Sequence, residues 1–400
     1  MVPSMSTIVY NPENQNKTVI VGMSGGVDSS VTALILKKQG YKVIGLFMKN
    51  WEEQDEFGVC QSSKEYKDVI SVCEKLDIPY YSIDFVEEYR ANVFQHFLDE
   101  YELGHTPNPD ILCNREIKFK VFFDKAMELG ADYLATGHYC RNLLIDGVHH
   151  LGKGVDPKKD QSYFLYAINP KVLDKVLFPV GELEKSEVRK LAHEFDLSTK
   201  DKKDSTGICF IGERNFKNFL SQYLQAKTGL FKTLDGTVVG EHSGSSYYTI
   251  GQRKGLGLGG QGEPWFVVDK DHEQNVVFVE RGEEHPSLYA DELWANELTW
   301  LNYKPKINEW VSATCKIRYR QNDQASEFMV LESGEVHVRF PVPQRAITIR
   351  QSVVFYHGDV CLGGGMISRR GKTHFEQGKL SMGFINQGSE FQEESSPSNI

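Results

Sequence analysis

The chain has 400 residues, of which 40% are hydrophobic and 25% are charged, and its formal net charge at pH 7 is −10. This length suits two or three domains with their own cores, and the composition excludes fibrous, collagen-like and wholly disordered proteins. The apolar runs are far shorter than the roughly 18 residues of a membrane-spanning helix, so we expect a soluble, cytoplasmic protein without a membrane partner. The acidic balance argues mildly against nucleic-acid binding, although a local basic patch can occur on an acidic protein.

The first half of the chain alternates between strand and helix patterns. Residues 1–16 are polar, lack an apolar core segment and predict a loose leader rather than a signal peptide. The predicted strands are 18–21, 42–48, 80–83 and 132–135, and the predicted helices are 29–38, 62–77, 87–102 and 115–129. This order predicts an α/β fold with a doubly wound parallel sheet, which binds ligands at the carboxyl ends of its strands.

The second half has a different pattern, with short strands and many glycines. A helix is expected at 213–225, the glycine-rich stretch GQRKGLGLGG follows at 251–260, and residues 288–367 alternate in the manner of a β-barrel. The last residues are rich in Gln, Ser, Glu and Gly and predict a disordered tail. We therefore expect a leader, a nucleotide-binding domain, a small central domain, a C-terminal β-barrel and a tail, with the boundaries 1–16, 17–212, 213–287, 288–367 and 368–400.

Residues 22–29 read GMSGGVDS and lie between the first strand and the first helix. Glycines, serine hydroxyls and a helix N-terminus together suit the binding of an anion such as phosphate. The spacing is not that of a Walker A loop, and the bland alternative is a Gly/Ser turn in which Asp28 caps the helix. Asp28 would be repelled by phosphate unless it meets Mg²⁺ or a backbone donor. The motif resembles the PP-loop of ATP pyrophosphatases, which implies cleavage of ATP between its α- and β-phosphates and adenylylation of an acceptor oxygen.

Two of the seven cysteines lie in polar, turn-forming segments. Cys113 follows Asn108-Pro109-Asp110 in a predicted loop before a helix, where the helix dipole would stabilise a thiolate and Asp110 could move a proton. Cys209 follows two lysines and a small, flexible stretch. Either cysteine alone is more often a buried filler. No C-x-x-C pair occurs, so neither a zinc ribbon nor a disulfide framework is predicted.

Taken together, these stretches resemble the tRNA-specific 2-thiouridylase (MnmA) family over about residues 17–367. The blocks that carry the resemblance, in chain order, are GMSGGVDSSV, MKNWEEQDEFGVC, PNPDILCNREIKF, LATGHY, KDQSYFL, LFPVGELEKSEVRKLA, DSTGICFIGERNFKNFL, YTIGQRKGLGLGG and CLGGGMI. Other PP-loop enzymes, such as argininosuccinate synthetase-like ligases, do not need the two cysteines. A non-catalytic RNA-binding protein that has kept the fold is the second alternative.

The resemblance implies a role for each matching residue. Cys113 would be the nucleophile, Cys209 would carry a persulfide, and Asp110 is the candidate general acid or base. Asn108, Pro109 and Asp110 would contact the target base. The residues implied to bind ATP are Gly22, Met23, Ser24, Gly25, Gly26, Val27, Asp28, Ser29, Met48 and Gly137. Those implied to contact tRNA are His138, Lys159, Asp160, Gln161, Arg318, Tyr319 and Gln351. Without the family resemblance, Lys159-Asp160-Gln161 would be interpreted as a solvated run of charges and Arg318-Tyr319 as part of an exposed strand face. His138 would be interpreted as a structural histidine.

The implied reaction adenylylates the C2 oxygen of a wobble uridine and then replaces it with sulfur from a persulfide. The sulfur could attack as released hydrosulfide or while still bound to Cys209, and the pattern does not choose between these routes. ATP with Mg²⁺ is the expected cosubstrate, without a prosthetic group or an evident set of protein metal ligands. The expected partners are tRNAs for Lys, Glu and Gln and a sulfur donor, either a cysteine desulfurase or a relay protein, and the free protein is expected to be a monomer.

One position departs from the family pattern. The family commonly has Pro-Gly before the glutamine of the last barrel strands, whereas Ile349-Arg350 precede Gln351 here. A Pro-Gly turn is therefore not expected, and the tRNA contact of Gln351 is less secure. Arg350 is a candidate for a phosphate contact in its place.

Overall fold

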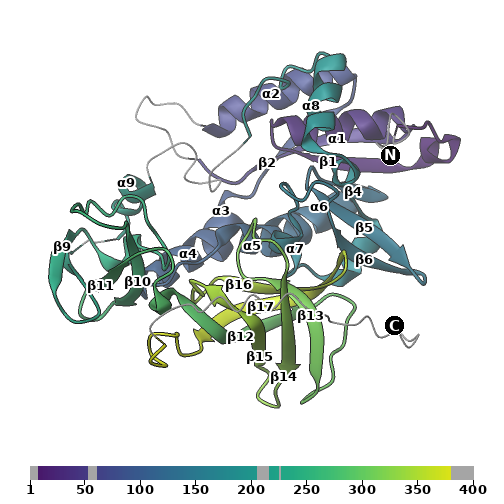
Figure 1. The fold of residues 1–400 in the computed structure, drawn as a ribbon. Coiled ribbons are helices and arrows are strands. Elements are labelled where there is room, and N and C mark those ends of the chain that lie inside the picture. Colours follow the sequence, from purple (N-terminus) through teal and green to yellow (C-terminus); the bar gives the residue numbers. More distant parts are fainter. Residues whose placement is uncertain (1–7, 53–60, 205–215, 225–226, 380–400) are drawn as a thin grey trace.

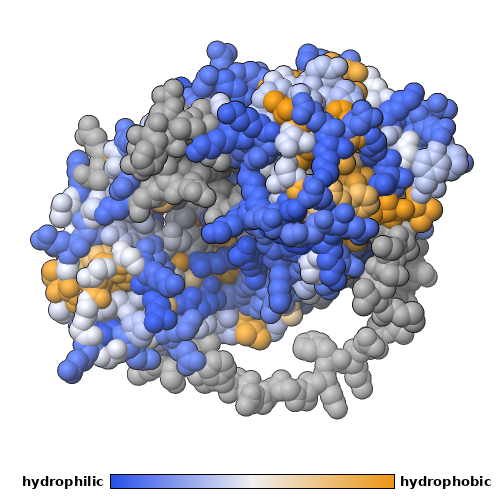
Figure 2. Space-filling model, turned by 90° about the horizontal axis from the view of Figure 1, so that it is seen from above, coloured by the Kyte–Doolittle hydropathy of each residue, from blue (hydrophilic) through white to orange (hydrophobic). Residues whose placement is uncertain are grey.

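The computed structural model describes residues 8–52, 61–204, 216–224 and 227–379. Figure 1 shows an α/β domain, a small β domain on one side of it and a β-barrel beneath it. Within the described residues, no helix is long and apolar enough to cross a membrane. The face in Figure 2 is mostly hydrophilic, with scattered hydrophobic patches rather than one continuous apolar area.

A five-stranded parallel sheet forms the centre of the α/β domain. Its strand order is β3-β2-β1-β4-β7, and each neighbouring pair is parallel. The strands are β1 (Thr18–Met23), β2 (Lys42–Lys49), β3 (Tyr80–Asp84), β4 (Tyr133–Ala135) and β7 (Val176–Leu177). The doubly wound sheet predicted from the alternation of strands and helices is thus confirmed, with the carboxyl ends of β1, β2 and β4 at one edge.

Helices cover both faces of this sheet because β1 alternates its apolar side chains between two cores. Val19, Val21 and Met23 pack in the core beneath α1 and α8, whereas Ile20 packs in the opposite core. The first face is covered by α1 (Val27–Lys38), α2 (Gln61–Leu76) and α8 (Lys185–Glu194). The second face is covered by α3 (Val86–Tyr89), η2 (Arg90–Phe94), α4 (Gln95–Glu102), α5 (Pro109–Leu112), η3 (Cys113–Val121) and α6 (Phe122–Glu128).

Residues 11–16 pack on the α/β domain, whereas we expected a loose leader over residues 1–16, of which residues 1–7 lie outside the described part of the chain. Residues Pro12–Asn16 form the 3₁₀ turn η1, and Asn11 caps it by accepting the Glu13 backbone N–H. Asn14 is buried and donates its side-chain amide to the Gln39 carbonyl at 3.0 Å. The polar sequence of this segment serves its capping and hydrogen bonding, so polarity alone was a poor sign of disorder.

The helix that we predicted from residue 115 begins earlier, at Pro109. Asn108 is its N-cap and accepts the Asp110 backbone N–H at 3.2 Å, while Pro109 occupies the first helical position. Proline suits this position because its fixed φ is helical and its missing N–H would have no intrahelical partner. Pro109 therefore starts this helix, and Cys113, which we predicted in a loop before it, lies inside the helical segment.

Six antiparallel strands close into the predicted C-terminal barrel. They run in the order β12-β15-β14-β13-β16-β17, and β12 also pairs with β17. Their bounds are β12 (Tyr289–Trp300), β13 (Trp310–Lys316), β14 (Gln324–Val330), β15 (Val336–Arg345), β16 (Ser352–His357) and β17 (Val360–Arg370). Strand β17 continues past residue 367, where we expected the tail to begin, and Thr373 and His374 are also buried.

A hairpin from the α/β domain extends the barrel sheet. It consists of β5 (Cys140–Ile145) and β6 (Val148–Lys153), and β6 pairs with β17 at Gly152 and Val360. The neighbouring short elements are α7 (Ser162–Leu165), η4 (Pro170–Lys175) and η5 (Pro179–Glu182). The buried contact between hairpin and barrel ties the first and last domains together.

The central domain is a four-stranded sheet in the order β10-β11-β8-β9. Its elements are β8 (Gly229–Lys232), β9 (Val238–His242), η6 (Ser245–Tyr247), β10 (Trp265–Asp271), β11 (Val276–Arg281) and η7 (Pro286–Leu288). Helix α9 (Phe216–Leu220) precedes this sheet, and its Phe219 packs against Phe94 of the α/β domain with ring centroids 6.1 Å apart. Although we assigned α9 to the central domain, its apolar face belongs to the core of the first one.

Candidate active site

The sequence GMSGGVDS forms the turn between β1 and α1, as predicted. The Ser24 backbone N–H donates to Ser29 Oγ at 3.2 Å, and Ser29 Oγ donates to the Gly26 carbonyl at 3.1 Å. Gly25 has φ +70°, and a Cβ there would lie 2.6 Å from the Glu65 carbonyl oxygen. The turn therefore needs glycine at this position, and it leaves the first amides of α1 at the carboxyl edge of the sheet.

Gly137 closes the site from the next strand. It follows β4, and a Cβ at this residue would lie 2.8 Å from Ser29 N and 2.9 Å from the carbonyl carbon of Asp28. The chain after β4 therefore rests directly on the first turn of α1. Met48 lies near the carboxyl end of β2, at the same edge of the sheet. The parallel sheet thus brings together the three segments that we predicted to bind ATP.

Asp28 is held by a lysine and a tyrosine rather than by a backbone donor. Lys185 Nζ lies 2.6 Å and 2.8 Å from the two carboxylate oxygens, and Tyr139 OH donates to Oδ1 at 2.7 Å. Burial raises the pKa of the Tyr139 hydroxyl, and the Asp28 charge raises it further, so this hydroxyl remains a donor. Lys185 thereby offsets the negative charge that would otherwise face a bound phosphate.

A second carboxylate, Asp204, is surrounded by three cations beside this pair. Its oxygens lie 2.6 Å from Lys159 Nζ, 2.9 Å from Lys185 Nζ and 2.7 Å from Arg189 Nη2. Burial raises the pKa of Asp204, but hydrogen bonds from Lys159 and Lys185 outweigh it and hold the pKa well below its usual value. We name the three basic side chains, Lys159, Lys185 and Arg189, the cation cluster.

Sequence analysis did not identify Lys185, Arg189 or Tyr139 as site residues. A signal existed, because Lys185 and Arg189 are four residues apart at the start of α8 and so share one helix face. Which element that face would meet was decided by the packing of α8 against α1. Lys202 was also unassigned, and its Nζ donates to the Gly25 carbonyl at 3.0 Å and pairs with Asp68 at 2.6 Å.

Cys113 lies in the second core and is 2% exposed, near the start of the helix that Asn108 caps. Burial raises the pKa of Asp110, and the Lys118 charge opposes this shift. Lys118 Nζ also lies 3.4 Å from His138 Nε2. Lys118 therefore interacts both with Asp110, on the same helical segment as Cys113, and with His138, which follows β4. Cys209, the predicted persulfide carrier, lies outside the described residues.

His138 is more enclosed than a simple tRNA contact would require. It is 8% exposed, its Nδ1 lies 2.8 Å from Thr136 Oγ1, and its ring packs against Phe119 and Phe178. Burial lowers the pKa of the imidazole, and the neighbouring Lys118 charge lowers it further. The ring is thus neutral at physiological pH, and its contact with tRNA stays a prediction.

The three residues of the segment Lys159-Asp160-Gln161 make different contacts within the fold. Lys159 joins the cation cluster, and Gln161 Oε1 accepts the Tyr139 backbone N–H at 2.9 Å. The Asp160 side chain is 2% exposed, accepts the Gly154 and Ser162 backbone N–H groups and pairs with Lys316 at 2.9 Å. Asp160 is therefore placed to join the first domain to the barrel, and a direct tRNA contact through its side chain would require this pair to open.

The predicted contacts from the barrel lie where the three domains meet. Arg318 Nη2 donates to the carbonyls of Ile250 and Ala346, at 2.8 Å and 2.9 Å. The Tyr319 ring packs on Phe164 with centroids 4.3 Å apart. These contacts connect the barrel to the central domain and to the α/β domain. A role in binding tRNA stays a prediction for both residues.

Gln351 and its neighbour Arg350 connect the barrel to the α/β domain. Gln351 Nε2 donates to the Thr106 carbonyl at 2.6 Å. The Arg350 guanidinium lies between Glu100 and Glu297, at 2.6 Å and 2.7 Å, and its side chain is 14% exposed. Both carboxylates would compete with a phosphate, so the structure does not support the phosphate contact that we considered for Arg350.

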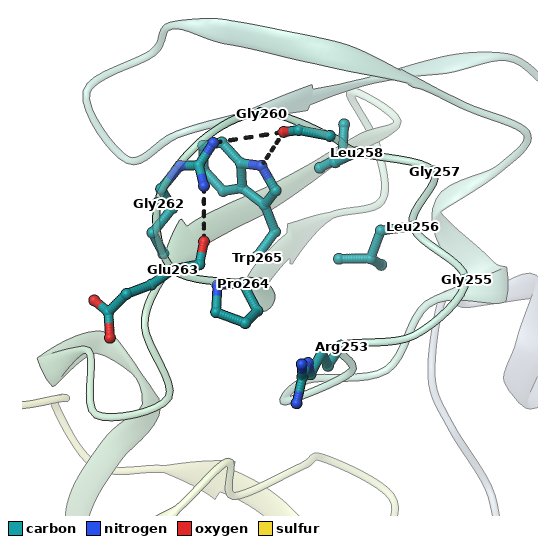
Figure 3. A pocket seen from close by; sticks show the side chains of 12 residues that line it. Arg253, Gly255, Leu256, Gly257, Leu258, Gly260, Gly262, Glu263, Pro264 and Trp265 are labelled. Atoms are coloured by element: carbon teal, nitrogen blue, oxygen red, sulfur yellow. Dashed lines mark hydrogen bonds between the residues drawn. The ribbon is translucent and has the colours of Figure 1, made fainter.

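The glycine-rich stretch of the central domain lines a pocket of about 290 Å³. Figure 3 shows Arg253 across this pocket from Trp265. Arg281 stacks over the Trp265 ring at 4.2 Å and donates to the Glu263 carbonyl at 2.7 Å. All of the lining residues belong to the central domain, so this pocket is separate from the loop at 22–29.

Within the described ranges, no group of three or more His, Cys, Asp or Glu side chains could hold a metal ion. The donors near the loop at 22–29 are instead cations, amides and hydroxyls, which suit phosphate oxygens rather than a metal. Any Mg²⁺ that accompanies ATP would take its ligands chiefly from the phosphates and water, with Asp28 as the nearest carboxylate of the loop.

Comparison with known proteins matches the chain along nearly its whole length. Three family profiles cover it in order, described as a tRNA methyl transferase HUP domain over 17–213, a tRNA methyl transferase PRC-barrel domain over 217–281 and an aminomethyltransferase beta-barrel domain over 290–367. A protein of Protochlamydia amoebophila named tRNA-specific 2-thiouridylase MnmA is 60% identical over 366 residues, which cover 91% of this chain and 96% of that protein.

Further relatives bear the same name. Those of Exiguobacterium sibiricum and Listeria monocytogenes are 56% and 57% identical, over 91% and 88% of this chain and 96% and 95% of their own lengths. Identity at this level, sustained through all three domains, shows that the chain belongs to the tRNA-specific 2-thiouridylase (MnmA) family.

Proposed function

We propose that this protein is a tRNA-specific 2-thiouridylase, an ATP-dependent sulfurtransferase that converts the wobble uridine of tRNA to 2-thiouridine. The observation that carries the proposal is the 60% identity to a relative of that name over 91% of the chain. The site supports it, because the loop at 22–29 presents amides and hydroxyls suited to phosphates and Cys113 lies on a helix that starts in the segment Asn108-Pro109-Asp110.

The first half-reaction activates a poor electrophile. The C2 oxygen of uracil attacks the α-phosphorus of ATP, the bond to the β-phosphate breaks, and pyrophosphate leaves. The first turn of α1 and the cations beside it stabilise the negative charge that develops on the phosphates. AMP then becomes the leaving group at C2. Asp110, whose pKa is raised by burial, is suited to exchange a proton with the base.

The second half-reaction delivers sulfur from a persulfide on Cys209. In one route, the Cys113 thiolate attacks Cys209 Sγ and releases hydrosulfide, which adds to C2 and expels AMP. In the other, the terminal sulfur of the persulfide adds to C2 and expels AMP first, and Cys113 then attacks Cys209 Sγ to break the S–S bond and free the 2-thiouridine. Both routes end with a Cys113–Cys209 disulfide, so a two-electron dithiol reductant must restore the thiols before another turnover.

The reaction also defines its partners. The substrate is tRNA for Lys, Glu or Gln, whose wobble base can be turned out of the anticodon loop into the site. The central domain and the barrel would bind the body of the tRNA and thereby position its wobble base at the site. The persulfide sulfur comes from a cysteine desulfurase or a relay protein. We place the enzyme in the cytoplasm and expect it to act as a monomer, with ATP and Mg²⁺ and without a prosthetic group.

The test is mass analysis of wobble nucleosides after tRNA is incubated with the protein, ATP, a sulfur donor and a dithiol. We expect 2-thiouridine with the wild-type protein and none above background with Cys113→Ser or Cys209→Ser. Cys315→Ala is the matched control, because this cysteine is buried in the barrel core, and it should retain product formation.

Two results would favour the alternative functions. Full turnover of ATP in both serine variants would indicate a PP-loop ligase that acts on another acceptor. Binding of tRNA without any tRNA-dependent release of pyrophosphate from ATP would indicate an RNA-binding protein without catalysis.

A further inference from the structure

We propose that Lys270 of the central domain is a positioning residue for sulfur transfer, because it holds the stretch of chain that leads into Asn108-Pro109-Asp110. We name this stretch, residues 104–107, the approach segment. The inference rests on the proposed function, in which Asn108, Pro109 and Asp110 meet the target base. Lys270 acts through the backbone of the approach segment and not on the base itself.

Lys270 joins two domains through one backbone carbonyl of each. It lies near the end of β10, where the central domain meets the end of α4 (Figure 1). Its Nζ donates to the Gly104 carbonyl at 2.7 Å and to the Tyr248 carbonyl at 2.8 Å. Burial lowers the pKa of this amine to about 8, as expected for a lysine enclosed between two packed surfaces. Lys270 is therefore a joint between domains rather than a solvated surface lysine.

Gly104 touches the central domain so closely that a side chain would not fit. A Cβ at this residue would lie 2.6 Å from Cγ of His272, the residue just after β10, and Gly104 has φ +75°. The His272 ring is held in turn, because its Nδ1 lies 3.0 Å from Ser245 Oγ. The end of β10 thus fixes Gly104 twice, by a hydrogen bond from Lys270 and by packing against His272.

The approach segment is also held two residues further on. Gln351 of the barrel donates its side-chain amide to the Thr106 carbonyl at 2.6 Å. Thr106 Oγ1 lies 3.4 Å from Oγ1 of Thr249 in the central domain. The two domains that would bind the body of the tRNA therefore each hold one carbonyl of the same short segment.

The chain between the approach segment and the helix of Cys113 has little freedom to absorb a shift. Pro107 and Pro109 have a fixed φ, and each proline confines the residue before it to extended geometry. Asn108 is extended accordingly, with φ −112° and ψ 96°, and it caps the helix by accepting the Asp110 backbone N–H. A displacement at Gly104 or Thr106 is consequently passed on to Asn108 and Pro109.

Such a displacement should slow the reaction without preventing its substrates from binding. Rates depend steeply on the alignment of reacting groups, and an error of about 1 Å can cost about a hundredfold. Affinity for tRNA depends mainly on many phosphate contacts, and ATP is expected at the loop 22–29, away from the approach segment. Loss of Lys270 should therefore lower kcat and leave KM for tRNA and the affinity for ATP nearly unchanged.

The first test compares rates of 2-thiouridine formation at saturating ATP and tRNA. We expect Lys270→Met to lower kcat about tenfold or more, with KM for tRNA within about twofold of the wild-type value. Lys270→Arg keeps a cationic donor and should recover most of the lost rate. Lys232→Met is the matched control, because this lysine lies in β8 of the same sheet, separated from β10 by β11, and it should keep the wild-type kcat.

The second test uses two glycines in matching helix ends. Gly104 and Gly130 each follow Glu-Leu, and their N–H groups donate at 3.0 Å to the carbonyls of Tyr101 and Met127, three residues earlier. Their φ angles are +75° and +84°, but a Cβ at Gly130 would meet nothing within 4 Å. Alanine therefore imposes similar backbone strain at both sites, and only Gly104→Ala should lower kcat about tenfold or more.

Wild-type kcat in Lys270→Met and in Gly104→Ala would overturn the inference and leave the proposed function intact, since the wild type would still form 2-thiouridine. An equal loss of rate in Gly104→Ala and Gly130→Ala, or a loss in Lys270→Met that is matched by a loss of ATP affinity, would also overturn it. If the wild type forms no 2-thiouridine, the proposed function fails and the inference fails with it. Thermal unfolding identifies a variant that does not fold, and the other variant then decides the question.

Discussion

The contact between Gly137 and the first turn of α1 gives a sharp test of the nucleotide site. A methyl group at Gly137 would lie 2.8 Å from Ser29 N, whereas ordinary contacts of a Cβ begin at 3.4 Å. Gly137→Ala must therefore push two backbone segments apart by about 0.6 Å. The φ angle of Gly137 is not in the left-handed region, so the cost comes from this contact alone.

We expect Gly137→Ala to lose about 1–3 kcal/mol of unfolding free energy through overpacking. The displaced amides of α1 should also weaken ATP binding by about tenfold or more, because binding depends on their alignment with the phosphates. Urea unfolding measures the first effect, and calorimetric titration with ATP measures the second.

Gly130→Ala is the matched control for this prediction. Gly130 has φ +84° and nothing within 4 Å of a built Cβ, so alanine is strained there without a new contact. Its cost should be about 1 kcal/mol, and ATP affinity should not change. Wild-type ATP affinity in Gly137→Ala, or an equal loss of affinity in both variants, would refute the reasoning.

Three further predictions concern charged and titrating groups. Lys316→Met should cost about 3 kcal/mol of unfolding free energy, because it leaves the buried Asp160 carboxylate without its cation. The double variant Lys316→Met with Asp160→Leu should recover much of this loss, as measured by urea unfolding. Arg350→Ala should lower the unfolding free energy by about 1–3 kcal/mol, because it leaves Glu100 and Glu297 without their cation. The salt dependence of tRNA binding should stay that of the wild type, whereas a shallower dependence would indicate that Arg350 contacts a phosphate after all. His138 has a pKa below 6.5 in the folded protein, so the unfolded state binds its proton first and stability falls as the pH drops below 6.5. His138→Gln should therefore lose less stability than the wild type between pH 7.5 and 5.5, and equal losses in urea unfolding would contradict this assignment.

Arg350 combines a left-handed backbone conformation with two ion pairs. Arg350 has φ +67°, a left-handed conformation that glycine adopts freely. A non-glycine residue in this region costs roughly 1 kcal/mol or more. The ion pairs with Glu100 and Glu297 offset that cost. Arg350 thus links α4 of the α/β domain to β12 of the barrel through these ion pairs.

Local sequence patterns were enough to predict the layers of the fold and the loop at 22–29. Periodicity predicted the parallel strands and the barrel because each strand's side-chain pattern is set by which of its faces is buried. The glycines of GMSGGVDS were informative because the tight turn into α1 restricts which residues fit there. Such local constraints depend on neighbouring residues alone, so they can be predicted without knowledge of distant contacts.

The pairing of charged side chains, in contrast, follows from how distant elements pack together. Lys159, Lys185 and Asp204 are far apart in the chain, and their convergence depends on how α8 and the turn after β6 pack around α1. The same holds for Asp160, whose buried pairing with Lys316 depends on where the barrel sits. Long-range electrostatic partners have no local periodicity to reveal them, because a charged side chain looks alike in sequence whether it faces water or a distant counterion.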